Sequence, residues 1–257
     1  MNRYSLVLAG AFAAALTLSA TGAGAKSIPA DIAAAVADSN RPDADKQRDA
    51  NRKPAESLVF AGVKPGVQIA EFFPGGGYFT RIFSKAVGTT GHVYALVPER
   101  PADAPADMPD FAAKVKAIAA DPNYPNVTVT VAAMSKLAPP APVDLVWTSL
   151  NYHDLHNLAG VDVAAFNKLM FDALKPGGVY VVLDHAAAAG SGARDTKTLH
   201  RIDPETVKTE VLAAGFKLAG SSDLLHQAGD DHTLKVFDPA IRGKTDQFIL
   251  KFRKPAK

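Results

Sequence analysis

The 257-residue sequence contains no cysteine and only a single tryptophan. Without a thiol, the chain cannot form a disulfide, hold zinc through thiolates, or use a cysteine as a nucleophile or redox partner. An excess of one charge is absent too, because 28 lysine and arginine residues stand against 26 aspartate and glutamate residues. The formal net charge of +2 gives no argument for a nucleic-acid partner or an acidic membrane surface. The length suffices for one α/β domain with a substantial core.

The N-terminus has the form of a secretory signal peptide. Arg3 supplies a positive charge, Leu6 to Leu18 is apolar, and Ala23-Gly24-Ala25 fits a small-residue cleavage site before Lys26. We therefore expect residues 1–25 to be removed, leaving an exported, periplasmic or secreted protein with no membrane-spanning helix. No cysteine follows the apolar stretch, which excludes a lipoprotein anchor. An uncleaved N-terminal anchor is the alternative.

Residues 26–54 form a predicted N-terminal accessory segment, and residues 55–257 form the main domain. Ile28 to Val36 is rich in alanine and predicts a short helix. Arg41 to Pro54 carries charges of alternating sign, which is typical of a solvated helix or of a lid over a sheet rather than of a core element.

The main domain opens with a strand, a glycine turn and a helix, over residues 67–80. An apolar run ends at Glu71, and three consecutive glycines follow at 75–77. Glycine allows positive φ and lets a ligand approach the backbone closely. The next apolar residues have the spacing of one helix face: Phe79, Ile82, Phe83 and Ala86. This order suits a nucleotide-type ligand site in an open α/β sheet, although a plain structural turn would have the same residues.

Strands and helices continue to alternate along the rest of the chain. We predict strands over 92–97, 127–131, 143–150 and 179–184, helices over 111–119, 161–174 and 204–215, and final strands over 216–224 and 247–253. Such alternation, followed by a terminal strand pair, predicts an α/β fold with a mostly parallel, doubly wound sheet.

The order of these motifs resembles that of the class I S-adenosylmethionine-dependent methyltransferases, most closely an exported bacterial branch of predicted methyltransferases. The resemblance covers roughly residues 55–253. It rests on the glycine loop 71–77, the strand 143–150 running into Asn151-Tyr152-His153-Asp154, the turn Leu174-Lys175-Pro176-Gly177-Gly178, and the terminal strand pair. It implies a Rossmann-like sheet of seven strands with a terminal antiparallel pair, and S-adenosylmethionine (SAM) as cofactor.

The resemblance also implies a set of cofactor-binding residues: Glu71, Phe73, Gly75, Gly76, Gly77, Tyr78, Val97, Glu99 and Asn151. Two of them depart from the family's pattern. Phe73 stands at the first glycine position, and Val97 stands where the family has a carboxylate for the ribose hydroxyls. Either Glu99, two residues on, replaces that carboxylate or cofactor binding is altered. A dinucleotide site is less well supported, because Thr80 takes the place of the third glycine of that motif.

Polar residues should converge where the first, fourth and fifth strands end, because the carboxyl ends of neighbouring parallel strands share one edge. The candidate catalytic residues at this edge are His153, Asp154, Asp184 and His185. His153 is our candidate general base, oriented by Asp154 or Asp184. The structural alternative is that His153 caps a helix or hydrogen-bonds its own loop.

Histidines also allow a metal hypothesis, with His153, Asp154, His156 and His185 as conceivable ligands at one sheet end. No His-Glu-x-x-His pattern is present, and we assign no metal ligand. His200-Arg201-Ile202-Asp203 precedes a helix, so a loop, lid or capping role is open. His226 and His232 are expected to be solvated.

The leading hypothesis is an enzyme: an exported SAM-dependent methyltransferase, a transferase acting on a small molecule or exported polymer. The alternative is an exported ligand-binding or metal-binding protein on a degenerate methyltransferase fold, which the departures at Phe73 and Val97 favour. The sequence leaves the methyl acceptor and the oligomeric state open.

Overall fold

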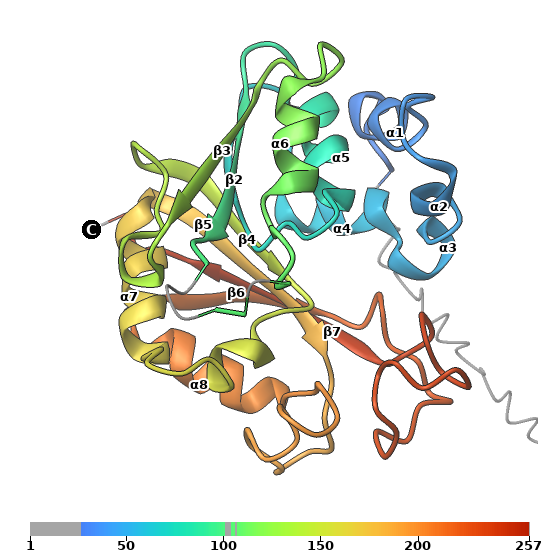
Figure 1. Cartoon of the computed structure of the whole chain (residues 1–257), viewed down its shortest axis with the longest axis vertical. Helices are drawn as coiled ribbons and strands as arrows, with labels where there is room; N and C mark the ends of the chain where they lie inside the picture. The colour runs from blue at the N-terminus through green and yellow to red at the C-terminus, as the bar shows by residue number, and fades with distance from the viewer. Residues whose placement is uncertain (1–26, 101–103, 106, 257) are drawn as a thin grey trace, which may run out of the picture.

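The structure is a computed structural model that describes residues 27–100, 104–105 and 107–256 (Figure 1). The predicted signal peptide, residues 1–25, lies outside the described residues. Within the described ranges, none of the helices has both the length and the apolar character needed to cross a membrane.

Seven strands form one sheet in the order β3-β2-β1-β4-β5-β7-β6. The strands are β1 Gln68–Phe72, β2 His92–Pro98, β3 Val127–Ala132, β4 Val143–Ser149, β5 Leu174–His185, β6 Lys217–Ser222 and β7 Gln247–Arg253. Strands β1 to β5 pair in parallel, and β7 runs antiparallel to both β5 and β6. The predicted fold class is confirmed, including the terminal antiparallel pair.

Helices cover both faces of the sheet (Figure 1). They are α1 Ala30–Val36, α2 Asp43–Lys46, α3 Asp49–Arg52, α4 Pro54–Ala61, α5 Tyr78–Val87, α6 Ala113–Ala120, α7 Val163–Ala173 and α8 Pro204–Ala213, with 3-10 turns η1 Met134–Lys136 and η2 His153–His156. Two apolar cores result. Phe79 and Phe83 of α5 pack on Trp147 in one core, and Phe166 of α7 packs on Phe72 in the other.

Local sequence signals set several helix ends. Asp203 caps α8 by accepting a hydrogen bond from the backbone nitrogen of Glu205, with Pro204 in the first turn as predicted. Gly88 follows α5 at φ 65°, a conformation that suits glycine. The helix predicted over 161–174 is shorter, because β5 already begins at Leu174.

The accessory segment packs against the main domain. Ile32 of α1 is fully buried in the core that contains α5, and Arg41 is only 2% exposed. Part of this charged segment is therefore buried, contrary to the expectation of a purely solvated helix, and the lid alternative describes it better. The segment lies beside α4 and α5, next to the carboxyl end of β1.

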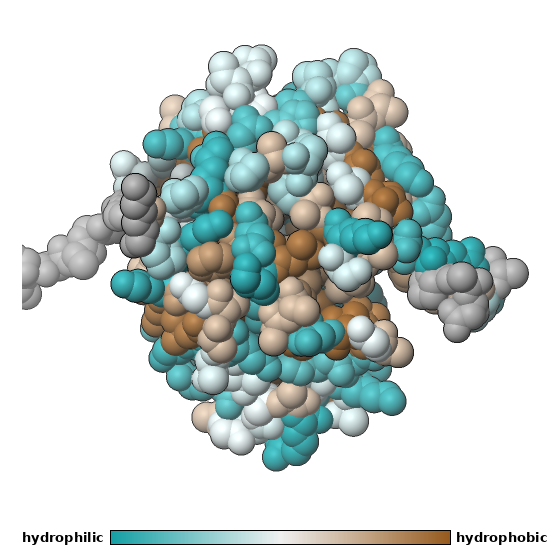
Figure 2. Space-filling view, turned by 90° about the vertical axis from the view of Figure 1, so that its left-hand side faces the viewer, coloured by the Kyte–Doolittle hydropathy of each residue, from teal (hydrophilic) through white to brown (hydrophobic). Residues whose placement is uncertain are grey.

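The surface is mixed in character. On the face drawn in Figure 2, hydrophilic residues interrupt the hydrophobic ones, which is ordinary for a folded protein. Phe111 and Phe237 are the most exposed large apolar side chains among the described residues, at 56% and 53%.

Candidate active site

A cavity of about 880 Å³ opens at the carboxyl ends of β1, β2 and β4, beneath the accessory segment. In this fold such a crevice is the usual place for a ligand. Eight of the predicted site residues line it: Glu71, Phe73, Gly75, Gly76, Tyr78, Val97, Asn151 and Asp154. The other five do not line it: Gly77, Glu99, His153, Asp184 and His185.

The loop after β1 keeps a left-handed backbone at its first glycine position. Phe73 has φ 51°, and its nitrogen donates to the carbonyl of Leu96 over 3.0 Å. A non-glycine residue in this region is strained, and such strain concentrates at functional sites. Phe73 therefore supplies the turn that a glycine would, and adds an aromatic ring whose centroid lies 4.3 Å from that of Phe72.

The three glycines have different reasons for being glycine. Gly75 has φ 58°. Gly77 is the N-cap residue before α5, at φ 78°, and a Cβ there would lie 2.1 Å from Cδ1 of Ile118. Gly76 has neither constraint, since its φ is not positive and no atom of the described residues lies within 4 Å of its would-be Cβ. Gly76 is thus free of structural demands and faces the cavity.

Glu71 is a buried carboxylate at the end of β1, only 3% exposed. Burial raises its pKa to about 7, while a hydrogen bond from Thr80 and the charge of Arg52 act in the opposite direction. The Thr80 hydroxyl donates to Glu71 Oε2 over 2.5 Å. Thr80, which the sequence marked only as a replacement for the third glycine of the dinucleotide motif, thus supplies a hydrogen bond to the buried carboxylate. Glu71 has no charge-paired partner at contact distance among the described residues.

Arg52 reaches the cavity from α3 and was missed by the sequence reasoning. Its guanidinium carbon lies 4.2 Å from the centre of the Tyr78 ring and 4.8 Å from that of Phe79. Its guanidinium donates a long hydrogen bond, 3.4 Å, to the hydroxyl of Ser149. Burial lowers the pKa of Arg52 to about 10, so the side chain remains cationic at neutral pH. A cation beside Glu71 in a ligand-sized cavity is suited to an anionic group.

Tyr78 links the glycine loop to the accessory segment. Its hydroxyl donates to Asp49 Oδ1 over 2.6 Å, and Asp49 also accepts from Arg41. The guanidinium groups of Arg48 and Arg52 both lie over the Tyr78 ring. The Tyr78 side chain therefore holds the accessory segment in place and also lines the cavity.

The ribose end of the predicted cofactor site departs from expectation. Val97 is buried at the cavity wall, while Glu99 is exposed and lies outside the lining. The structure therefore gives no support for Glu99 reaching back into the cavity. Asp110, which no sequence motif marked, lines the cavity and accepts from the backbone nitrogen of Ala112 over 2.8 Å.

Asn151 ties the ends of β1 and β4 together. Its side-chain nitrogen donates to the carbonyl oxygens of Phe73 and Ser149, at 3.1 and 3.0 Å, and its oxygen accepts from the Thr148 hydroxyl. Leu150, just before it, has φ 61°. Asn151 therefore shapes the cavity wall where the loops after two neighbouring strands meet.

His153 and Asp184 form a buried pair behind this wall. The carboxylate of Asp184 accepts from the ring Nδ1 and from the backbone nitrogen of His153, both over 2.8 Å, and from the backbone nitrogen of His185. Burial alone would lower the pKa of His153, but the charges of Asp184 and Asp154 outweigh it and raise the pKa. The predicted convergence of strand ends is present, and Asp184 rather than Asp154 holds Nδ1.

The outer face of His153 meets two further groups. Its Nε2 lies 3.3 Å from Asp154 Oδ1 and 3.3 Å from His200 Nδ1. His200 comes from the loop before α8, where the sequence indicated only a loop, lid or cap. The other histidines of the metal hypothesis point elsewhere, His156 toward Glu210 and His185 toward Thr245, and burial lowers the pKa of His185 to about 4.

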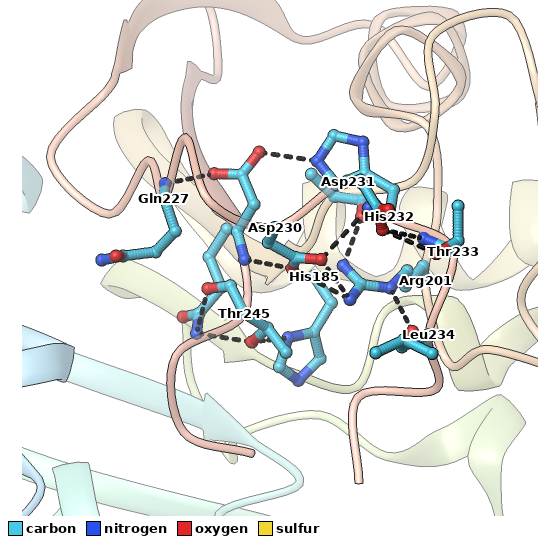
Figure 3. A network of polar contacts seen from close by, with 12 residues as sticks. His185, Arg201, Gln227, Asp230, Asp231, His232, Thr233, Leu234 and Thr245 are labelled. Atoms are coloured by element: carbon cyan, nitrogen blue, oxygen red, sulfur yellow. Dashed lines mark hydrogen bonds and ion pairs between the residues drawn. The ribbon is translucent and has the colours of Figure 1, made fainter. Parts of the chain in front are cut away.

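A polar network organises the loops at this edge of the sheet (Figure 3). Arg201, fully buried, contacts Asp230 over 2.9 Å and donates to the carbonyls of Ala186 and Leu234. His226 is solvated as expected, with its side chain 59% exposed, whereas His232 is only 24% exposed; both rings also contact the carboxylate of Asp246 at 2.9 Å. The carboxylate lies before β7, so these loops are joined to the sheet.

Comparison with known proteins identifies the fold. No protein-family model and no curated protein matches the chain. Among solved structures, the chain is similar to a SAM-dependent methyltransferase from Aquifex aeolicus, with 16% identity, a TM-score of 0.56, and coverage of 82% of this chain and 95% of that one. An arsenic(III) S-adenosylmethionine methyltransferase from Chlamydomonas reinhardtii has 17% identity and a TM-score of 0.54, over 88% and 74% of the two chains.

The cyclase SpnF is also similar, with 17% identity and a TM-score of 0.55, over 83% of this chain and 82% of that one. The chain therefore has the fold that these methyltransferases share. Because one fold carries several chemistries, its activity has to be argued from the site itself.

Proposed function

We propose that this protein is a SAM-dependent methyltransferase acting on an acceptor whose identity is open. The observation that carries the proposal is the cavity at the glycine loop, which brings Glu71, Arg52 and the bare backbone of Gly76 together. The volume, about 880 Å³, suits a nucleoside-sized ligand and part of an acceptor. The similarity of fold to known methyltransferases supports it.

The two charged side chains suit the amino-acid end of the donor. Glu71 has no cationic partner at contact distance in the described part of the chain and would pair with the ammonium group, and Arg52 would pair with the carboxylate. Asp110 is the available carboxylate for the ribose hydroxyls, in the role that we had considered for Glu99. Arg52 would make the accessory segment part of the donor site.

In the proposed transfer, a lone pair of the acceptor attacks the methyl carbon while the carbon–sulfur bond breaks. The sulfur leaves with the bonding electrons as the neutral thioether S-adenosylhomocysteine. An oxygen or nitrogen acceptor loses its proton, and we propose that the proton reaches His153 Nε2 by way of Asp154, which lines the cavity 3.3 Å from that nitrogen. Asp184 holds the opposite ring nitrogen. Positioning of the two reactants supplies much of the rate.

The test is calorimetric titration of the protein with SAM and S-adenosylhomocysteine. Micromolar binding is expected for the wild type. Gly76→Val should weaken binding by more than about tenfold, or about 1.4 kcal/mol, because the new side chain enters the cavity. The matched control is Gly229→Val, at a glycine that is also exposed, unstrained and open around its Cβ but lies outside the cavity lining. Equal binding by both variants would remove the donor assignment.

Ligand binding without methyl transfer is the second candidate. It is favoured by Val97, which offers no hydrogen bond where a carboxylate is expected, and by the exposure of Glu99. The two candidates differ in a direct way: a methyltransferase releases S-adenosylhomocysteine when supplied with a suitable acceptor, and a binding protein releases none with any member of an acceptor panel.

We further propose that the protein is exported after cleavage behind Ala25. The support is the charge, apolar stretch and small residues of positions 3–25. N-terminal sequencing of the protein from a fractionated bacterial host should find Lys26 as the first residue in the exported fraction. A cytosolic protein that retains Met1 or Asn2 would contradict export.

A further inference from the structure

Three potential ligand atoms from two loops meet at the edge of the cavity: His153 Nε2, Asp154 Oδ1 and His200 Nδ1. They lie within 4.8 Å of one another. The separations are 3.3 Å between the His153 and Asp154 atoms, 3.3 Å between the two histidine nitrogens, and 3.7 Å between the His200 and Asp154 atoms. Two imidazoles and a carboxylate are a donor set that suits divalent first-row transition metals.

The separations can be compared with a known coordination shell. Zinc binds histidine nitrogen and carboxylate oxygen at about 2.0–2.2 Å in tetrahedral sites, so two of its ligand atoms lie about 3.3 Å apart. The three separations between the ligand atoms equal this ligand–ligand distance or slightly exceed it. The atoms therefore need only small movements to share one ion.

The protonation of His153 favours the same arrangement. Its Nδ1 donates to Asp184, which leaves Nε2 as the nitrogen that carries the free lone pair in neutral imidazole. A carboxylate behind a histidine is the usual support of a metal-binding imidazole. Asp184 is fully buried and also accepts from the backbone of His153, so both the position and the tautomer of the ring are held.

His200 is held in place by its neighbours rather than by its own contacts alone. Arg201 forms an ion pair with Asp230 (Figure 3). The backbone nitrogen of Ile202 donates to the carbonyl of His185 over 3.0 Å. His200 itself has φ 56°, a conformation that costs free energy for a residue with a Cβ. In this conformation its ring lies against that of His153, with centroids 5.4 Å apart.

We propose that His153, Asp154 and His200 bind one divalent transition-metal ion of the zinc type, supported by Asp184 from behind. Three protein ligands leave a coordination position for water or substrate, which is the arrangement of catalytic rather than structural zinc sites. Asp154 lines the cavity, so the proposed ion would lie beside the space proposed for donor and acceptor.

The metal site defines a class of acceptor, a step that rests on the proposed function. A bound ion occupies the Nε2 lone pair, so it replaces His153 as the group that promotes proton loss. An acceptor hydroxyl coordinated to the ion loses its proton to solvent and attacks as the metal-bound oxygen anion. Alcohols and phenols, whose hydroxyl oxygen can take the one open position, are therefore the expected acceptors of the loaded protein.

The experiment is titration of the chelator-treated protein with zinc alone, followed by calorimetry and by metal analysis after desalting. One zinc ion per chain is expected. His200→Gln and Asp154→Asn should each weaken zinc binding by more than about 100-fold, since even the loss of a supporting partner costs about 10–100-fold. Both side chains are partly exposed, at 25% and 40%, so the variants should fold.

The matched control is His156→Gln. His156 belongs to the same 3-10 turn as His153 and Asp154, but its ring contacts Glu210 instead. The variant should bind zinc as the wild type does. Cobalt in place of zinc should give the intense visible absorption of a four-coordinate ion in the wild type and lose it in His200→Gln. Absence of stoichiometric zinc in the wild type, or equal binding in His200→Gln, would overturn the metal site. Neither result depends on SAM binding, so the two proposals fail separately.

Discussion

Two buried carboxylates, Glu71 and Asp184, stand near the ends of parallel strands in the same sheet, and their surroundings give them opposite properties. Glu71 accepts one side-chain hydrogen bond, from a neutral hydroxyl, and burial raises its pKa to about 7. Burial acts on Asp184 in the same direction, but the charge of His153, the hydrogen bonds from its ring and backbone nitrogen, and the charge of His185 outweigh it and lower the pKa.

The difference shows which carboxylate has unused capacity. Asp184 has its partners within the fold, so it positions His153 rather than waiting for a ligand. Burial of Glu71 costs desolvation free energy, and the protein offsets little of it with hydrogen bonds or charges. This is typical of a group whose partner arrives with a ligand. Three measurements test this difference between Glu71 and Asp184.

The largest expected effect is on folding. Asp184→Ala leaves the His153 ring and two backbone nitrogens without their acceptor, and should lower the free energy of unfolding by about 3–5 kcal/mol. Urea denaturation measures this change. Asp172→Ala is the control, because Asp172 forms an exposed pair with Lys168 on α7, and such pairs contribute about 0–1 kcal/mol. Equal losses in both variants would show that Asp184 is not the anchor described above.

The second effect is a pH-dependent gain from Glu71→Gln. The pKa of Glu71 is raised from 4.5 to about 7 by folding, so its stabilising contribution is present below about pH 4.5 and is lost as the pH rises to about 7. Glutamine removes this loss. The variant should match the wild type near pH 4.5 and exceed it by about 3 kcal/mol above pH 7.

Urea denaturation across this pH range checks the Glu71→Gln prediction. Glu56→Gln, on an exposed position of α4, controls for the loss of one acid. A Glu71→Gln difference that stays constant with pH would mean that the carboxylate is ionised at its ordinary pKa despite its burial.

The smallest effect concerns SAM affinity. If the donor ammonium pairs with ionised Glu71, binding below the folded pKa must release a proton from that carboxyl. Affinity should then fall by about tenfold per pH unit below about pH 7 and level off above it. Asp184, with its lowered pKa, is ionised throughout this range and adds no slope. Calorimetry at several pH values tests this, and a slope that persists in Glu71→Gln would assign it to another group.

Sequence reasoning succeeded where the chain is regular. The run ending at Glu71, the glycine turn and the α5 face predicted the β1–α5 unit, and the sharing of one edge by parallel strand ends predicted that His153 and Asp184 would meet. These inferences need only the geometry of strands and helices, which the pattern of apolar residues determines.

The same reasoning failed for residues placed by irregular segments. Arg52 reaches the cavity because α1 to α3 fold back over α5, and no periodicity in a charged segment predicts that path. His200 meets His153 because Arg201 and Ile202 are bound to neighbouring loops. The available signal was compositional: three arginines among the charges of alternating sign at residues 41–54, and a His-Arg pair before a helix.

The left-handed backbone at Phe73 has a further consequence, which concerns chirality. Its φ of 51° is the ordinary conformation of a D-amino acid, and an L-residue loses about 1–2 kcal/mol by adopting it. Leu150, at φ 61° after the neighbouring strand, has the same handedness, so two mirror-image bends flank the cavity. The site thus requires a left-handed backbone at this position more than it requires glycine. A search for relatives by glycine spacing alone would overlook chains that adopt this backbone with a residue other than glycine.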